Sequence, residues 1–249
     1  MDVINRNISS WNEKVNSGSP WSIPVSSEVI QKAKEGVWEI TVTATKPVPR
    51  GWFPSLQGKT ILCLASGGGQ QGPVLAAAGG NVTVLDFSEG QLKQDRLVAE
   101  REGLTINTVL GDMTDLSEFA DEQFDLIIHP VSNLYIPDIE VVWNQAYRII
   151  RTGGTLISGF MNPVFYLFDW SLQEQGVLQV KHPLPYSDLE YLADHEEGAA
   201  IEFGHTLEAQ IQGQLSAGFV INGFYEDTYG GERLLDTYTS SFLATRAVK

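Results

Sequence analysis

Short apolar segments alternate with segments of helical periodicity from residue 60 onward, and this alternation constrains the fold more than any other feature. The apolar segments are short enough to be strands, whereas the segments between them place apolar residues at helical spacing. Strands that alternate with helices predict a parallel sheet joined by right-handed crossovers, hence an α/β architecture. The expected strands are residues 60–65, 81–86, 105–110, 124–129 and 154–160, and the expected helices are residues 70–78, 91–102 and 139–151.

The last part of the chain departs from this alternation. Thr206 is placed to cap a helix that ends at Gly218, and residues 219–225 and 241–248 have the composition of two strands. The link between these strands is rich in turn residues and leaves no room for a crossover helix. We therefore expect the two strands to be antiparallel.

Two aromatic segments flank the alternating part. We expect one domain over residues 1–249, with an N-terminal extension (1–56), a central core (57–160), an insert (161–205) and a closing helix with a strand pair (206–249). The extension and the insert are too long and too aromatic for plain loops. We expect both to cover the open end of the sheet and to form a lid over a ligand.

The glycine-rich stretch Cys63–Gly72 reads CLASGGGQQG and follows the first expected strand. Ligands of open α/β sheets bind beyond the carboxyl ends of the strands, and glycines allow the backbone to approach a ligand closely. Asp86 ends the second strand, where its carboxylate can accept hydrogen bonds from ribose hydroxyls. Gly67, Gly69 and Gly72 also match the dinucleotide pattern G-x-G-x-x-G, so NAD and S-adenosylmethionine both remain open at this point.

Later turns separate these two ligands. Gly111-Asp112 follows the third strand, Phe124-Asp125 opens the fourth, and Ile136-Pro137-Asp138 and Gly153-Gly154 flank the third helix. With this ordered set the chain resembles the class I S-adenosylmethionine-dependent methyltransferases, in particular the small-molecule branch that includes methyltransferase-domain-11-like proteins. The resemblance covers residues 57–160 and the closing strand pair. It implies a Rossmann-like sheet of seven mainly parallel strands, the last antiparallel, with helices on both faces.

The resemblance also implies which residues bind the cofactor. The glycine loop lines the methionine moiety, Asp86 holds the ribose, and Asp112 accepts from the adenine amino group. His129 and Pro130 face the amino-acid end and the transferred methyl group. The implied set is Ala65, Ser66, Gly67, Gly69, Gln70, Asp86, Phe87, Ser88, Gln91, Gly111, Asp112, Met113, His129 and Pro130.

The chain departs from the family pattern at two loop positions. Cys63 stands where the family usually has an acid that helps to fix the loop, and Ala65 stands where it usually has glycine. The alanine is a mild change if its φ is negative. We expect Gln70 and Gln71 to replace the missing contacts.

Methyl transfer from a sulfonium is an in-line displacement that depends mainly on proximity and orientation. A general base is required only when the acceptor must lose a proton. His129 and Tyr135 are weak candidates for a catalytic role; His129 can equally shape the pocket, and Tyr135 can simply pack. The residues expected to contact the acceptor are Trp11, Trp21, Ser132, Asn133, Tyr135, Phe165, Tyr166 and Trp170.

Composition narrows the class of partner. The net charge of −15 disfavours nucleic acid, whose phosphates require clustered Lys and Arg. A single cysteine, a polar N-terminus and the lack of a spanning apolar run indicate a cytoplasmic protein that does not contact membranes. Scattered histidines indicate no metal site. We expect S-adenosylmethionine as cofactor, S-adenosylhomocysteine as product, a small-molecule acceptor, and a monomer or homodimer. An NAD-dependent oxidoreductase and a non-catalytic S-adenosylmethionine-binding protein are the alternatives.

Overall fold

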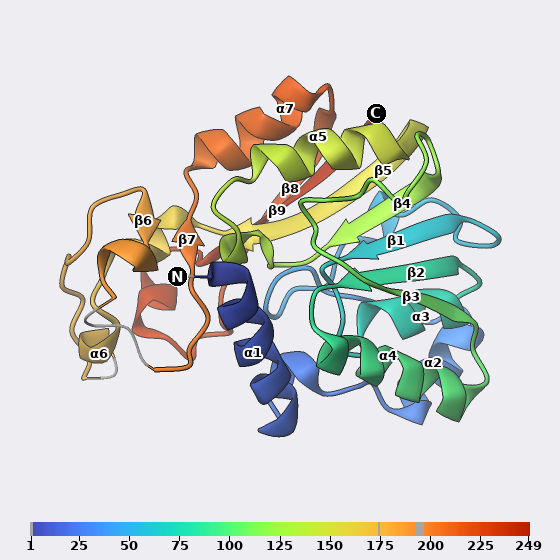
Figure 1. Ribbon diagram of the computed structural model, residues 1–249, viewed down its shortest axis with the longest axis horizontal. Helices are drawn as coiled ribbons and strands as arrows, with labels where there is room; N and C mark the ends of the chain where they lie inside the picture. Colours follow the sequence, from blue (N-terminus) through green and yellow to red (C-terminus); the bar gives the residue numbers. More distant parts are fainter. Residues whose placement is uncertain (1, 174, 193–196) are drawn as a thin grey trace.

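A seven-stranded sheet forms the centre of the protein in a computed structural model that describes residues 2–173, 175–192 and 197–249 (Figure 1). The strands lie in the order β3-β2-β1-β4-β5-β9-β8. Their bounds are β1 (Thr60–Leu64), β2 (Asn81–Asp86), β3 (Ile106–Leu110), β4 (Phe124–His129), β5 (Ile150–Met161), β8 (Val220–Asp227) and β9 (Phe242–Val248).

The direction of the last strand matches the expectation from the sequence. β1 pairs in parallel with β2 and β4, and β3 and β5 extend the sheet in the same direction. β9 runs antiparallel between β5 and β8. The α/β, Rossmann-like fold and the antiparallel closing pair are therefore confirmed.

Helices cover both faces of the sheet (Figure 1). One side carries α2, α3 and α4, and the other carries α5 and α7. Each layer encloses its own apolar cluster, one around Ile61 and Leu75 and one around Leu62 and Trp143. The bounds are α2 (Ser27–Lys34), α3 (Gln71–Ala77), α4 (Glu89–Glu102), α5 (Glu140–Ile149) and α7 (Gly213–Ala217).

Local chemistry explains where the structure differs from the expected bounds. α4 begins two residues early because the Ser88 side chain accepts from the Gln91 amide and caps it. The helix expected over 206–217 begins instead as a π-helical turn (Glu208–Gln212). Gly213 then packs so closely on Trp143 that a Cβ there would lie 2.6 Å from the indole ring. This close approach fits α7 against α5.

The N-terminal extension divides between two places. Helix α1 (Val3–Asn16) lies in front of the carboxyl ends of the strands, and the Asn12 side chain accepts from Ser88 and Gly90 of α4 (Figure 1). Helix α2 packs on α3, and Trp38 and Trp52 pack against the sheet cluster. Only part of the extension therefore lies at the ligand end of the sheet. The 3-10 turns of this region are η1 (Pro20–Ser22) and η2 (Arg50–Trp52).

The insert lies beside the extension, next to the end of β5 (Figure 1). It contains helix α6 (Trp170–Gln173) and a small antiparallel pair, β6 (Tyr186–Ser187) with β7 (Phe203–Gly204). Residues 174 and 193–196 of the insert lie outside the described residues. The remaining 3-10 turns are η3 (Asn133–Tyr135), η4 (Pro163–Leu167), η5 (Asp188–Glu190) and η7 (Leu234–Thr237).

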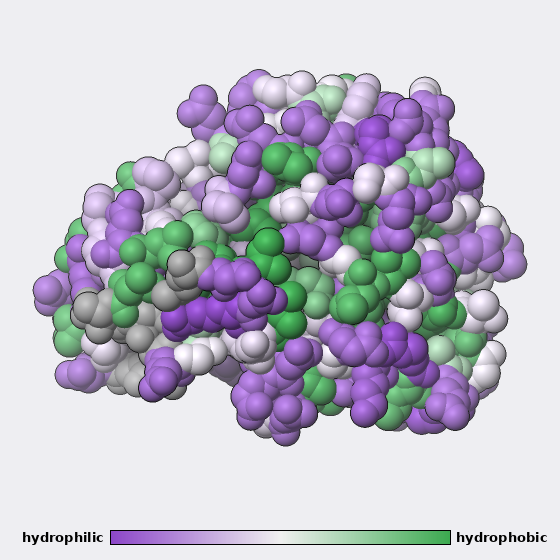
Figure 2. All heavy atoms as spheres, in the orientation of Figure 1, coloured by the Kyte–Doolittle hydropathy of each residue, from purple (hydrophilic) through white to green (hydrophobic). Residues whose placement is uncertain are grey.

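Hydrophilic side chains cover most of the face in Figure 2, as expected for a chain of net charge −15. Hydrophobic side chains gather in patches near the centre of this face. Among the described residues, no helix is both long enough and apolar enough to span a bilayer.

Candidate active site

A cavity of about 470 Å³ opens beyond the carboxyl ends of β1, β2, β3 and β4. Each of these strands leads directly into a segment that lines the cavity, which is where open α/β sheets bind ligands. Its volume falls in the range of roughly 300–1,000 Å³ that is usual for small-molecule sites. The lining segments include Ala65–Gly67, Asp86–Phe87, Gly111–Met113 and Pro130–Ser132.

Most residues expected from the sequence line this cavity. The expected cofactor residues that line it are Ala65, Ser66, Gly67, Gln70, Asp86, Phe87, Gln91, Gly111, Asp112, Met113 and Pro130. The expected acceptor residues that line it are Trp11, Trp21, Ser132, Tyr135, Phe165, Tyr166 and Trp170. Gly69, Ser88, His129 and Asn133 are not among the lining residues.

His129 is turned away from the cavity. Its ring is fully buried and packs edge-on against Trp143. Nδ1 donates to the Leu64 carbonyl at 3.0 Å, and Nε2 is buried with no hydrogen-bond partner in the described part of the chain. Burial lowers the pKa of His129 to about 4, although the Leu64 bond opposes the shift. A neutral, enclosed ring cannot reach an acceptor, so the geometry does not support His129 as a general base or a ligand of the donor.

Asn133 and Ser88 also have structural partners. The Asn133 side chain donates to Gln210 beneath the cavity, at 2.8 Å. Ser88 caps α4, and its amide donates to Asp86 at 2.9 Å. Both residues support the wall of the cavity from behind.

The glycines of the loop lie against protein atoms. A Cβ on Gly68 would lie 2.8 Å from the Trp21 carbonyl oxygen, and one on Gly69 would lie 2.9 Å from the Gln94 carbonyl. A Cβ on Gly72 would lie 2.7 Å from Val84. Gly69 and Gly72, two of the three positions of the G-x-G-x-x-G pattern, are therefore explained by close packing of the loop, α4 and the extension.

Ala65 adopts a left-handed backbone conformation with φ of 47°. Alanine in place of the usual glycine was expected to be a mild change only if the φ of Ala65 were negative, but this φ is positive. A left-handed alanine costs roughly 1–2 kcal/mol relative to the right-handed region. The surrounding loop therefore holds Ala65 in the conformation that glycine adopts freely.

Asp95 supplies a carboxylate in place of the acid that was expected at the position of Cys63. This fully buried side chain of α4 accepts from the Gly68 amide at 3.0 Å, and the Gly69 amide lies close enough to affect its pKa. Burial raises the pKa of Asp95 to about 7, although both amides oppose this and the charge of Asp86 adds to it. The loop-fixing carboxylate thus comes from a helix instead of from the strand.

Gln70 and Gln71 both make contacts around the glycine loop. Gln70 donates to the Pro20 and Ile23 carbonyls of the extension, at 2.9 and 3.1 Å. Gln71 accepts from the Ser66 hydroxyl of the loop at 3.2 Å and donates to the Thr41 carbonyl at 3.0 Å. Gln71 therefore supplies an acceptor to the loop, as expected, whereas Gln70 joins the loop to the extension.

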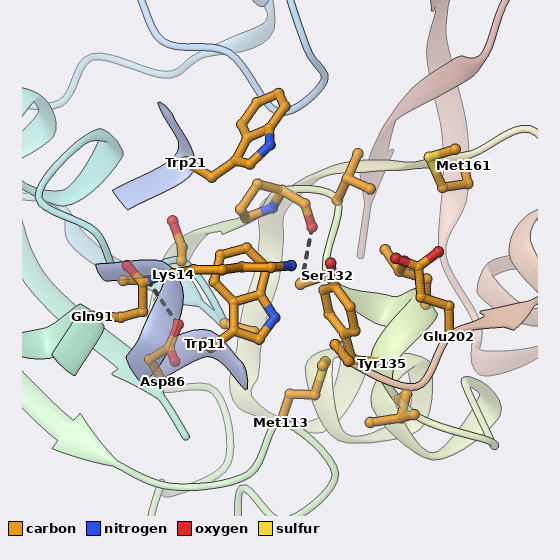
Figure 3. A pocket seen from close by; sticks show the side chains of 18 of the residues that line it. Trp11, Lys14, Trp21, Asp86, Gln91, Met113, Ser132, Tyr135, Met161 and Glu202 are labelled. Atoms are coloured by element: carbon orange, nitrogen blue, oxygen red, sulfur yellow. Dashed lines mark hydrogen bonds between the residues drawn. The ribbon is translucent and has the colours of Figure 1, made fainter. Parts of the chain in front are cut away.

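Asp86 presents a buried carboxylate to the cavity (Figure 3). Gly67 and Ser88 each donate an amide to it at 2.9 Å. Burial raises the pKa of Asp86 to about 6, and these amides oppose the shift. Beside it, Gln91 donates to Ser22 at 2.8 Å, while its buried Oε1 has no partner among the described residues. On this side of the cavity the Asp86 carboxylate therefore offers acceptor oxygens, which suit a ligand that carries hydroxyl donors.

The other side of the cavity is an aromatic chamber formed by parts of the chain distant in sequence. Phe165 and Trp170 of the insert lie 3.8 Å apart between ring centres. Tyr135 packs edge-on against Trp11 of α1 at 5.4 Å. The sequence analysis missed further chamber residues, which come from α1, from the insert and from the link between β8 and β9: Lys14, Tyr186, Asp188, Glu202, Tyr229, Arg233 and Phe242.

Comparisons with known proteins agree with this geometry. A family described as a methyltransferase domain matches residues 62–158. A Bacillus subtilis (strain 168) protein named uncharacterized methyltransferase YbaJ is 54% identical over 253 residues, covering 99% of this chain and 98% of that protein.

Solved structures share the fold. An S-adenosylmethionine dependent methyltransferase from Mesorhizobium loti matches with a TM-score of 0.64 and 18% identity, over 80% of this chain and 95% of that one. The 1,6-didemethyltoxoflavin-N1-methyltransferase of Burkholderia thailandensis matches with a TM-score of 0.60 and 13% identity, over 99% of this chain and 87% of that one. The latter holds its acceptor and S-adenosylhomocysteine.

These findings favour methyl transfer over the hydride transfer that the glycine pattern alone left open. The similarity to the Bacillus subtilis protein extends over nearly the whole chain, including the extension and the insert. The strand order and the single antiparallel strand are those implied by the sequence resemblance. The chain therefore belongs to the class I S-adenosylmethionine-dependent methyltransferases.

Proposed function

We propose that this protein transfers a methyl group from S-adenosylmethionine to a small molecule held in the aromatic chamber. The observation that carries the proposal is the single cavity that joins the Asp86 carboxylate to the chamber of Phe165, Trp170 and Tyr135. A two-substrate reaction requires both reactants in one enclosed space.

The donor side fits a nucleoside. Asp86 lines this side of the cavity and provides carboxylate oxygens that accept from ribose hydroxyls. Phe87 and Met113 line the same part of the cavity and offer apolar surface to an adenine ring, and Asp112 offers a carboxylate to its amino group. The Ala65–Gly67 turn lies at the end of β1 and faces the methionine part.

The bound cofactor supplies an activated methyl group on a sulfonium. The protein then aligns the acceptor heteroatom with this group and excludes water. Orientation of this kind supplies about 7–11 kcal/mol of barrier reduction. The extension and the insert carry out this task, because α1 and η4 bring Trp11 and Phe165 to the cavity wall.

The same walls support a small acceptor. The chamber is lined from several sides by side chains of the extension, the insert and the β8–β9 link, and its volume is about 470 Å³ together with the donor side. An excess of 31 acidic over 16 basic residues also disfavours a nucleic acid acceptor. These features support a small molecule over a macromolecule.

Calorimetric titration with S-adenosylhomocysteine tests the proposal. The wild type should bind it, and Asp86→Ala should weaken binding at least about tenfold because one hydrogen bond to a charged group contributes about 1.5–3 kcal/mol. Asp86→Asn keeps the side-chain shape and separates loss of charge from loss of packing. Glu100→Gln on the exposed face of α4 is the control and should bind as the wild type does.

Absence of heat with both S-adenosylmethionine and S-adenosylhomocysteine would refute the proposal. Turnover is the second part of the test. Release of S-adenosylhomocysteine in the presence of an acceptor distinguishes an enzyme from a protein that only binds the cofactor.

A further inference from the structure

Two cationic side chains face the aromatic chamber. Lys14 of α1 places Nζ 4.2 Å from the ring centre of Trp11 and 5.6 Å from that of Tyr135. The Arg233 guanidinium lies 4.8 Å from the ring centre of Trp170. Neither cation forms an ion pair with a carboxylate in the described part of the chain. The lack of ion pairs at these two cations stands out in a chain of net charge −15, because an excess of carboxylates would ordinarily pair with them.

The carboxylates of the chamber already have partners within its wall. Asp188 accepts from the Tyr186 hydroxyl at 2.5 Å and from the Glu202 amide at 2.7 Å. Glu202 accepts from the Tyr166 hydroxyl at 3.0 Å. These contacts join β6, η5 and η4 to the residue that precedes β7, so the carboxylates hold the wall together.

Lys14 lies between the two halves of the cavity. Figure 3 shows its side chain crossing the centre, with Asp86 and Gln91 on one side and Tyr135 and Glu202 on the other. Its ammonium group points toward Ser132, close to the turn that follows β4. Lys14 therefore lines the cavity between the two halves, where it can contact an acceptor.

We propose, on the basis of the proposed function, that the acceptor is a planar aromatic compound with an acidic hydroxyl, and that Lys14 binds the ionised oxygen that receives the methyl group. A sulfonium and an ammonium in one cavity repel each other, and an acceptor anion between them attracts both. Aromatic walls favour a flat ring over an aliphatic chain. A phenol-type hydroxyl combines both properties.

The transfer is balanced without a further reactant. The hydroxyl proton goes to water when the anion forms beside Lys14. The oxygen then forms a bond to the methyl carbon while the bond from that carbon to sulfur breaks. The electron pair of the broken bond stays on sulfur, which leaves as the neutral thioether.

Several charged and titratable groups surround Lys14, and a test of its role must keep them constant. Burial lowers the pKa of Lys14, and the charge of Glu202 opposes this. Tyr135 and Glu202 face Lys14 from the chamber side, and Asp86 and Asp112 line the donor side. A variant that replaces only Lys14 keeps all of these groups, so a difference in ligand binding between wild type and variant reports on Lys14 itself.

The probe is 4-nitrophenol, added to the complex of the enzyme with S-adenosylhomocysteine. Its phenolate absorbs visible light, so a spectrophotometric pH titration gives the pKa of the bound hydroxyl. We expect this pKa to lie at least one unit below that of free 4-nitrophenol. Lys14→Met should remove about a tenfold preference for the anion, while Lys46→Met, whose ammonium lies over Tyr225 and not in the cavity, should retain it.

The neutral isostere 4-nitrotoluene completes the design. It should bind wild type and Lys14→Met with equal affinity, because its contacts are only with the aromatic walls. Lys14→Gln repeats the substitution with a polar side chain, and S-adenosylhomocysteine affinity shows that both variants keep the donor side intact.

The outcomes separate this inference from the proposed function. If S-adenosylhomocysteine binds but 4-nitrophenol binds no better than 4-nitrotoluene, or if Lys14→Met leaves the bound pKa unchanged, the assignment of Lys14 and of an acidic acceptor is wrong. If S-adenosylhomocysteine itself fails to bind, the proposed function fails instead.

Discussion

Replacement of Asp95 by asparagine should abolish part of the pH dependence of folding. The pKa of Asp95 rises from its ordinary value of 3.8 to about 7 because the carboxyl is buried under the glycine loop. An unfolded Asp95 ionises near pH 4, whereas the folded protein holds the proton up to about pH 7. The folded state therefore binds more protons in this window, and its stability falls as the pH rises from about 4 to 7.

The structure sets the size of the effect. Each pH unit in this window corresponds to about 1.4 kcal/mol. Because the pI is about 4.6 and proteins associate readily near their pI, the measurement should span about pH 5.5 to 8. Over that range Asp95 should cost the wild type about 2 kcal/mol, which is about 4–8 °C of Tm for a chain of this size.

Thermal unfolding followed by circular dichroism at several pH values measures this slope. Asp95→Asn should show a smaller loss of Tm than the wild type between about pH 5.5 and 8. Glu100→Gln, on the exposed face of the same helix, should keep the wild-type slope. Asp86 contributes a slope of the same sign in all three proteins, since burial raises its pKa to about 6. Identical slopes for wild type and Asp95→Asn would show that Asp95 does not titrate in this way.

Two further substitutions test the loop and the extension. Gly68→Ala should lower S-adenosylhomocysteine affinity at least about tenfold, because its Cβ would lie 2.8 Å from the Trp21 carbonyl. For the same reason it should lower the free energy of unfolding by more than the roughly 1–2 kcal/mol that a left-handed backbone costs an alanine. Gly103→Ala is the control, because Gly103 also has a positive φ but lies in open space and should show the backbone cost alone. Asp227→Asn should lower stability by about 2–4 kcal/mol, because the buried carboxylate accepts from Thr45 at 2.7 Å and from three further residues. Burial favours a higher pKa for Asp227, but these bonds outweigh it and hold the pKa low, so this contribution should vanish as the pH falls below about 4. Equal Tm and affinity in variant and wild type would contradict either prediction.

The central fold was predictable because its signals are local. Buried strands such as β1 and β4 are short and mainly apolar, and their lengths exclude most other assignments. Helices α1 and α2 were not assigned from the sequence, because both are polar on most of their surface and lie in a segment with several prolines. Their positions depend on contacts with α4 and α3, which no local pattern reveals.

The donor side of the site was predictable for a related reason. The residues that follow β1, β2 and β3 are fixed in place by the strands, so Asp86 and Asp112 line the cavity as expected. His129 was not, because it is the last residue of β4 and the pleat turns its ring toward Trp143. Strand position gave the level of this side chain along the sheet but not the face to which it points.

The acceptor side was predicted only in part: most of its aromatic residues were expected, but its charged residues were not. Lys14 and Glu202 lie close in space but 188 positions apart in the chain, and neither belongs to a motif. Asp95 did carry a local signal that was not used. It lies between Leu92 and Val98 at helical spacing, so a carboxylate occupied the apolar face of α4.

The donor side and the chamber come from different parts of the chain, and this has a consequence for how acceptor specificity can change. Under the proposed function, the ends of the strands contact the donor, whereas most of the chamber comes from α1, the insert and the β8–β9 link, which are connected to the sheet by loops. Surface connections tolerate replacement far better than packed strands do. Acceptor preference can therefore diverge between homologous proteins while the donor side stays fixed, and exchange of these three segments is a rational route to altered acceptor specificity.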